Sequence, residues 1–269
     1  MVSIVLPRLV NLKGPARRAV SVAERNATAL KSAYWLVMIS GFFEPVLYLF
    51  SIGWGVGALV GDLTLPTGQV VSYAAFVAPA MLASSAMNGA LAETTFNFFG
   101  KMKYMKLYDG VLATPVRPFE IALGELGWAM LRGTAYSAGF LAIMVAMGLT
   151  SAGRALAAFP AAVLVGFAFG ALGMALSTFM RSWQDFDLLA SAQFTLFLFS
   201  GTFVPAQAYP AVLRWLVEVT PLYRSVELIR GITAGTAGWE QLINVAYLLA
   251  VITFGLWLAG RRMGKLLYK

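Results

Sequence analysis

Few side chains in this sequence could do chemistry. The chain has no histidine and no cysteine, which excludes imidazole and thiolate metal sites and every Ser–His or Cys–His catalytic arrangement. The candidates that remain are four ionisable residues inside apolar stretches: Glu44, Glu93, Glu125 and Arg132. Charges at bilayer depth are costly, and they usually face a protein interior or water, where they mark substrate or proton paths. We therefore predict no catalytic residue and no metal site, and we take these charges as candidates for a transport path.

Two of these charges lie at similar depths within their apolar stretches. Counted from one end of the stretch, Glu44 and Arg132 are each roughly 18–21 Å deep at 1.5 Å per helical residue. They can therefore pair, because each charge would relieve the desolvation cost of the other. Glu93 and Glu125 lie nearer to water. The alternative is that all of these groups only hold helices together.

Proline and aromatic residues complete the candidate set. Pro45 directly follows Glu44 and should bend its helix, because proline removes an intrahelical hydrogen bond. Phe194 and Phe197 could line a substrate path, or they could face lipid or the core. The candidates for a substrate path or its gating are Glu44, Pro45, Glu93, Arg132, Phe194 and Phe197.

Membrane helices must position these residues. Hydrophobic residues make up 59% of the 269 residues and charged residues 12%, whereas soluble domains are about half apolar and a quarter charged. Glycines at Gly166, Gly170 and Gly173 also indicate close helix packing. We predict an all-α membrane protein with six transmembrane helices, each long enough to cross about 30 Å of hydrocarbon. They run over residues 33–60, 70–99, 118–149, 156–180, 188–204 and 241–260.

Lysines and arginines set the expected orientation. They concentrate in residues 1–31, 101–117 and 261–269. Because cytoplasmic segments carry an excess of these residues, both termini are predicted to be cytoplasmic. The same rule explains the net charge of +8, so we expect no nucleic-acid partner.

Two segments are expected to lie at the membrane surface. Residues 1–31 are basic with apolar residues at helical spacing, which is typical of an amphipathic helix facing lipid headgroups; the alternative is a disordered tail. The rest of the chain, residues 32–269, then forms a single transmembrane domain. Residues 205–240 lie outside and combine Trp215 with three prolines, Pro205, Pro210 and Pro221. This pattern favours a re-entrant external hairpin of two helices over an ordinary loop.

The loop over residues 101–117 is the most distinctive cytoplasmic segment. A short helix is predicted from about Met105 to Ala113, and Thr114-Pro115 should end it, because proline disfavours helix in the residue before it. This helix would present Leu107, Val111 and Leu112 to something outside the membrane, or it would only anchor the loop. The sequence has no GxxxxGK motif for nucleotide phosphates, so any ATP-driven function needs a partner.

The same loop carries a family resemblance. The stretch Tyr108-Asp-Gly-Val-Leu-Ala-Thr-Pro-Val, followed by Phe119-Glu-Ile-Ala-Leu-Gly-Glu, is similar to the cytoplasmic loop of type-2 ATP-binding-cassette permeases. Ser200-Gly-Thr-Phe-Val-Pro and the prolines that follow resemble the family's pattern near its fifth span. The stretch beginning Phe43-Glu-Pro-Val looks closest to the nodulation-factor exporter branch, with drug-resistance permeases next.

The resemblance implies a function for the whole chain. It implies a permease subunit in the bacterial plasma (inner) membrane that exports an amphipathic substrate: a lipid-linked saccharide, a glycolipid or a hydrophobic drug. A second permease subunit and separate ATPase subunits, which hold ATP and Mg, are the implied partners; a homodimer is favoured. The implied coupling residues are Leu107, Tyr108, Asp109, Val111, Leu112, Thr114 and Pro115. The alternative is an ion-coupled secondary transporter that uses the intramembrane carboxylates.

Overall fold

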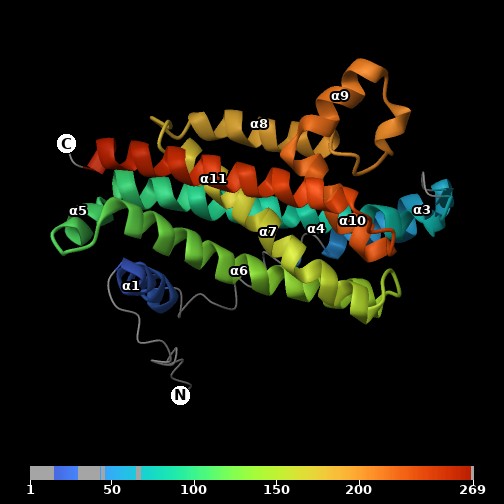
Figure 1. Ribbon diagram of the computed structural model, residues 1–269, viewed down its shortest axis with the longest axis horizontal. Helices are drawn as coiled ribbons and strands as arrows, with labels where there is room; N and C mark the ends of the chain where they lie inside the picture. Colours follow the sequence, from blue (N-terminus) through green and yellow to red (C-terminus); the bar gives the residue numbers. More distant parts are fainter. Residues whose placement is uncertain (1–14, 30–42, 44–45, 65–67, 268–269) are drawn as a thin grey trace.

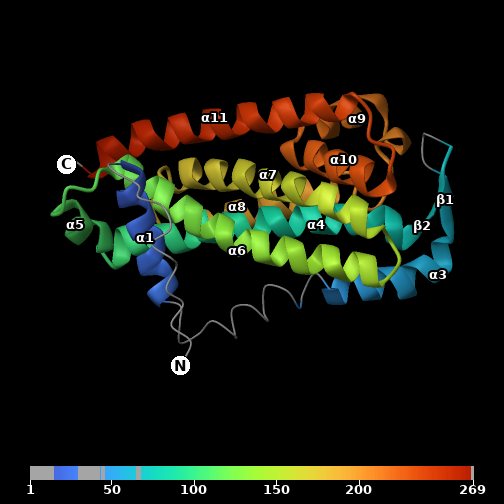
Figure 2. The same ribbon diagram turned by 60° about the horizontal axis from the view of Figure 1, so that its bottom comes forward.

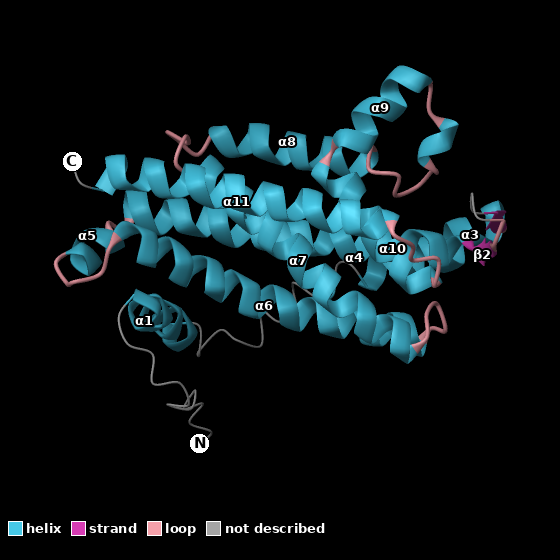
Figure 3. Cartoon of the chain, viewed as in Figure 1, coloured by secondary structure: helices cyan, strands magenta, loops and turns pink. Residues whose placement is uncertain are grey.

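The structure is a bundle of long helices (Figures 1 and 3). The computed structural model describes residues 15–29, 43, 46–64 and 68–267. Its long helices are α4 (Tyr73–Leu91), α6 (Pro118–Ala146), α7 (Ala152–Ser177) and α11 (Glu240–Leu267). The shorter helices are α1 (Pro15–Ala29), α3 (Gly57–Val60), α5 (Leu107–Leu112), α8 (Asp185–Leu198), α9 (Ala211–Val219) and α10 (Pro221–Ala234). Three π-helical segments, η1 (Ser51–Val56), η2 (Ala92–Asn97) and η3 (Gly100–Tyr104), a 3₁₀ turn η4 (Ala206–Ala208) and two short antiparallel strands, β1 (Asp62–Thr64) and β2 (Val70–Ser72), complete it.

Four helical runs among the described residues are long and apolar enough to cross a membrane. They are Tyr73–Tyr104, which joins α4, η2 and η3, together with α6, α7 and the run Glu240–Lys265 of α11. This agrees with the predicted all-α membrane fold. The first predicted span is described only over its second part, where the apolar helix Val46–Val60 is shorter. Helix α8 has 14 residues, about 21 Å at 1.5 Å per residue, so six spans stay a prediction.

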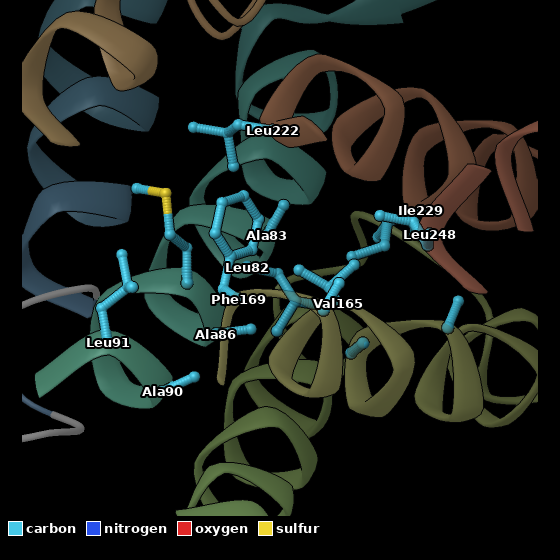
Figure 4. Packing of buried hydrophobic residues seen from close by; sticks show 14 of the residues in the cluster. Leu82, Ala83, Ala86, Ala90, Leu91, Val165, Phe169, Leu222, Ile229 and Leu248 are labelled. Carbon is cyan, nitrogen blue, oxygen red and sulfur yellow. The ribbon is translucent and has the colours of Figure 1, made fainter. Parts of the chain in front are cut away.

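Helix α7 occupies the centre of the bundle. It packs against α4, α6, α10 and α11, and Figure 4 shows Phe169 and Val165 among buried side chains of α4, α10 and α11. Glycine allows this close packing: a Cβ on Gly173 would lie 2.2 Å from Thr94 Oγ1, and one on Gly255 would lie 2.8 Å from the backbone of Ala171. The predicted packing role of the glycines in this segment is therefore confirmed within one chain.

The two ends of the bundle carry different elements. One end, here named the α5 end, holds α5, α1 and the last turns of α11 (Figures 1 and 2). The opposite end holds α3, the β1–β2 hairpin and the junction of α9 with α10. The predicted topology also separates the loop at 101–117 and the C-terminus from residues 205–240. The sides of the membrane on which these ends lie stay a prediction.

Helices α9 and α10 form a helix–proline–helix pair. Pro210 directly precedes α9, Pro205 precedes η4, and Pro221 is the first residue of α10. Thr220 caps α10, because its Oγ1 accepts a hydrogen bond from the Tyr223 amide at 3.3 Å. Trp215 is 64% exposed. The two helices joined at a proline are present as expected, and their re-entry into a membrane stays a prediction.

The N-terminal segment is helical where it is described. Helix α1 crosses α6 (Figure 2), and Val22 is buried in this contact. Gly124 makes room for it, since a Cβ there would lie 2.5 Å from the Ala19 carbonyl oxygen. Val20, an apolar residue of the same helix, is 41% exposed. Helix α1 therefore has an exposed apolar residue outside the surface that packs on α6.

Candidate functional site

A cavity of about 570 Å³ lies between α8 and the bundle. Side chains from α4, η2, α6 and α8 line it, together with Tyr48 from the helical turn before η1. Four of the residues predicted for a substrate path share this lining: Glu93, Arg132, Phe194 and Phe197. Glu44 and Pro45 lie outside the described residues. The structure thus brings together the members of the predicted set that it describes.

An ion pair forms the polar centre of the cavity. Arg132 of α6 binds Glu93 of η2, and its Nη2 donates a hydrogen bond to the hydroxyl of Tyr136 at 3.2 Å. The two charged side chains are only 16% and 9% exposed. The Arg132 Nε is buried and has no hydrogen-bond partner among the described residues. A buried donor without a partner is costly, so the hydrogen bonding of Arg132 is incomplete among the described residues.

Arg132 contacts a carboxylate that was expected nearer to water. Its expected pairing with Glu44 stays a prediction, because Glu44 lies outside the described residues. The sequence predicted that Arg132 lies as deep as Glu44 and that Glu93 lies nearer to water. In the structure, Arg132 contacts Glu93. Helix η2 is π-helical, and the wider turn of such a segment, which is frequent at functional sites, shifts the side chains that follow relative to an α-helix. The helical run also continues to Tyr104, beyond the predicted end at residue 99, so Glu93 lies deeper than that boundary implies.

The opposite wall of the cavity belongs to α8. The Gln193 Nε2 donates to the Asn88 Oδ1 at 3.2 Å, which joins α8 to α4. Phe197 packs edge-to-face on Tyr48, with ring centres 6.4 Å apart. The Oγ of Ser84 is buried without a partner among the described residues. Sequence reasoning missed Ser84, Asn88 and Gln193, although Ser84 and Asn88 are four residues apart on one face of an apolar helix.

The composition of this cavity suits an amphipathic molecule. Glu93 and Arg132 balance each other in formal charge, and neutral amides and hydroxyls surround them. Phe194, Phe197 and Met81 supply apolar surface. Ligand sites of this size are typically apolar with a few placed polar groups. A ligand with a hydrogen-bonding head and an apolar tail would satisfy both parts of the lining.

A second polar cluster lies at the α5 end. Glu125 of α6 is 3% exposed and accepts hydrogen bonds from Arg25 at 2.8 Å, Asn26 at 2.9 Å and Lys101 at 2.7 Å. The alternative reading of the intramembrane charges, that they hold helices together, fits Glu125, since side chains of α1 and η3 bind it. One turn before it, Glu120 binds Arg18 of α1 at 2.8 Å. The carboxylates of α6 therefore hold α1 and η3 in place.

Tyr108 anchors α5 beside this cluster. Its side chain is 1% exposed, and its ring centre lies 5.2 Å from that of Phe98. Burial, together with the nearby negative charge of Glu125, raises the pKa of Tyr108, so the phenol stays protonated at neutral pH. Tyr108 thus attaches α5 to the bundle from within.

The exposed face of α5 differs from the predicted one. Val111 and Leu112 are half-buried and pack against the core of the bundle, so the expectation that they face outward is corrected. Leu107 is half-buried as well. Asp109, Thr114 and Pro115 are exposed. An amphipathic helix at the end of a bundle uses its larger apolar side chains to anchor itself, which leaves small and polar residues on its outer surface.

Comparisons with known proteins agree with this architecture. The family described as "ABC-2 type transporter" matches residues 19–234. Nodulation protein J of Rhizobium leguminosarum bv. trifolii is 34% identical over 225 residues, which cover 83% of this chain and 84% of that protein. Nodulation protein J of Rhizobium meliloti is 30% identical over 218 residues, 81% of each chain. The inner membrane transport permease YadH of Escherichia coli K12 is 26% identical over 216 residues, 77% and 78% of the two chains.

The matched region is most of the protein. It begins in α1, includes the cavity between α4, α6 and α8, and ends with α10. It contains no nucleotide-binding GxxxxGK motif, and the loop that carries α5 lies in its middle. The chain belongs to the ABC-2 type transporter family.

Proposed function

We propose that this chain is the transmembrane permease subunit of an ATP-driven exporter and that the cavity between α4, α6 and α8 is its substrate site. The observation that carries the proposal is the lining of that cavity, where a paired Glu93 and Arg132 lie opposite Phe194 and Phe197. The substrate is an amphipathic molecule: a lipid-linked saccharide, a glycolipid or a hydrophobic drug. It leaves the cytoplasm or the inner leaflet of the bacterial inner membrane.

The ATPase is a separate subunit that holds ATP and Mg. In this proposal it docks on the α5 end of the bundle, where Asp109, Thr114 and Pro115 are exposed. Both termini are then cytoplasmic, and the chain crosses the membrane six times with α8 as the fifth span. A second permease subunit, most simply another copy of this chain, completes the transporter, because α8 has no buried residue in the single chain.

Binding of the ATPase tests the docking surface. The Asp109→Lys variant reverses an exposed charge, while the control variant, Arg214→Glu, reverses an exposed charge on α9 at the other end of the bundle. We expect co-purification with a cognate ATPase subunit to fall at least tenfold in Asp109→Lys and to remain within twofold of wild type in Arg214→Glu. Equal co-purification of both variants would contradict docking at α5.

The same preparation separates the exporter from an ion-coupled transporter. A proteoliposome with wild-type permease and ATPase should move a fluorescent amphiphile only when ATP is supplied. Movement that follows an imposed proton gradient without ATPase would instead favour proton binding at Glu93, the carboxylate that lines the cavity.

A further inference from the structure

Five aromatic side chains form a cluster at the α5 end, and we name it the aromatic clasp: Phe96, Phe99, Tyr104, Trp183 and Phe186. Trp183 is its centre. The ring centre of Trp183 lies 4.8 Å from Phe96, 5.4 Å from Phe99 and 5.4 Å from Phe186, and the indole stacks on Tyr104 at 5.1 Å. These are the distances at which aromatic pairs attract one another.

The clasp joins two segments that are far apart in sequence. Phe96, Phe99 and Tyr104 belong to the helical run that begins with α4 and ends just before α5. Trp183 lies in the loop between α7 and α8, and Phe186 lies in the first turn of α8. The clasp therefore joins the first turn of α8 to the helical run that leads into α5.

The loop on the α8 side is itself fixed by hydrogen bonds. The Asp185 Oδ2 accepts from the backbone amides of Arg181 at 2.6 Å and Ser182 at 3.2 Å. A carboxylate in the first turn of a helix that binds free backbone amides holds the entering chain in one direction. Trp183 lies between these anchored residues, and its carbonyl oxygen accepts from the Phe186 amide at 3.1 Å, so its backbone is fixed relative to the first turn of α8.

Within the single chain, α8 packs against the bundle through half-buried side chains such as Leu196 and Phe197. None of its residues is buried, whereas α7 buries residues along its whole length. A hydrogen bond between Gln193 and Asn88 joins α8 to α4. Within a single chain, a helix with few buried contacts has low local stability and moves more easily than the buried helices around it.

The opposite side of the clasp leads directly to α5. Between η3 and α5, Lys106 adopts a left-handed conformation with φ 47°. Such a conformation is unusual for a residue other than glycine and indicates a bend that the surrounding structure imposes. Tyr104 lies two residues before this bend and stacks on Trp183, so only a short segment separates α5 from the clasp.

We propose that the aromatic clasp transmits movement of α5 to α8, and that α8 is the moving wall of the cavity. Residues Gln193, Phe194 and Phe197 of α8 line the cavity, roughly 10–17 Å along the helix from Phe186 at 1.5 Å per residue. A displacement of Trp183 would move these side chains relative to Glu93 and Arg132. The clasp residues act as positioning residues. This inference rests on the proposed function, because it assigns the ATPase as the source of the force.

Two measurements test the clasp. Because the chain has no native cysteine, spin labels can be attached at Leu131→Cys on α6 and Ser191→Cys on α8, both exposed positions. The distance between the labels should change by several ångströms when the ATPase and a non-hydrolysable ATP analogue are added. An unchanged distance in this otherwise wild-type protein overturns the inference, whatever the Trp183 variants do.

Variants of Trp183 test the mechanism in the complete transporter. We expect Trp183→Ala to retain ATPase co-purification and ATP hydrolysis within twofold, and to lose at least tenfold in fluorescent amphiphile moved per ATP hydrolysed. Trp183→Phe should restore this ratio to within threefold. Trp239→Ala, which removes an indole that is 73% exposed, should behave as wild type.

The outcomes distinguish the two proposals. If wild type moves no amphiphile with ATP and ATPase, the proposed function is wrong. If wild type transports and Trp183→Ala transports with the same ratio, only the clasp is wrong. If Trp183→Ala does not fold, the label distance in the otherwise wild-type protein decides.

Discussion

Replacing Glu125 by glutamine is expected to destabilise the protein strongly. The side chain of Glu125 is 3% exposed, and those of its cationic partners Arg25 and Lys101 are 31% and 19% exposed. Removing one partner of a buried ion pair costs about 3–5 kcal/mol. Because both cations retain some contact with water and glutamine can still accept from Asn26, we expect a smaller loss, about 2–3 kcal/mol.

This loss can be measured as a shift in unfolding temperature. In a chain of this size 1 kcal/mol moves the midpoint by about 2–4 °C, so Glu125→Gln should lower it by roughly 4–12 °C. The matched control is Glu218→Gln. Glu218 pairs with Arg214 near the surface, where the side chain of Arg214 is 46% exposed and that of Glu218 is 30% exposed. An exposed pair at this spacing contributes only about 0.3–0.5 kcal/mol. Equal midpoints for the two variants in detergent, measured at one heating rate, would refute the assignment of Glu125 as the junction between α1, η3 and α6.

Three further predictions follow from the packing, the loop before α8 and the cavity. Gly173→Ala should lower stability by about 1–3 kcal/mol, because the added Cβ would meet a threonine of η2, whereas Gly153→Ala has open space and should be neutral or stabilising in the same melting assay. Backbone amides that bind Asp185 hold its pKa below its ordinary value. The loop should therefore be protected from hydrogen exchange above about pH 4 and lose protection as the pH falls through that lowered pKa, while Asp185→Asn should show no such transition. A double-mutant cycle on Glu93→Gln and Arg132→Gln should give a coupling energy of at least about 1 kcal/mol, and additive effects would exclude a functional pair.

Part of the site was predictable because charges inside apolar sequence are rare. Glu93 and Arg132 stand out for that reason alone, and the structure places both in one cavity with Phe194 and Phe197. The neutral residues of the lining, such as Asn88, have no comparable signal, because an amide in a membrane helix costs less and occurs more often. The residues that carry charge were therefore found and the residues that complete the hydrogen bonding were not.

Contacts between segments that are distant in the sequence could not be predicted from it. Glu125 binds Arg25 across about 100 residues, and no local pattern indicates that α1 crosses α6 at that turn. The outward face of α5 was assigned from side-chain apolarity, yet Val111 and Leu112 anchor the helix to the bundle. Amphipathic spacing predicts that a helix has two faces, and the tertiary packing decides which face is covered.

In the proposed function, the substrate moves through the cavity between α4, α6 and α8. Gly89 lines this cavity, and a Cβ placed on it meets nothing within 4 Å, so Gly89→Trp would fill the space without displacing the backbone. Gly127 of α6 is equally open but exposed on the outside of the bundle, and it does not line the cavity. Gly127→Trp is therefore the matched control.

The measurement is ATP-driven movement of a fluorescent amphiphile in proteoliposomes that contain the permease and its ATPase. The probe is whichever of three the wild type moves fastest: a nitrobenzoxadiazole-labelled alkyl glycoside, a nitrobenzoxadiazole-labelled phospholipid or rhodamine 6G. We predict that Gly89→Trp binds ATPase normally and loses at least tenfold in transport, while Gly127→Trp transports as wild type does. Wild-type transport by Gly89→Trp would contradict the assignment of this cavity as the substrate path.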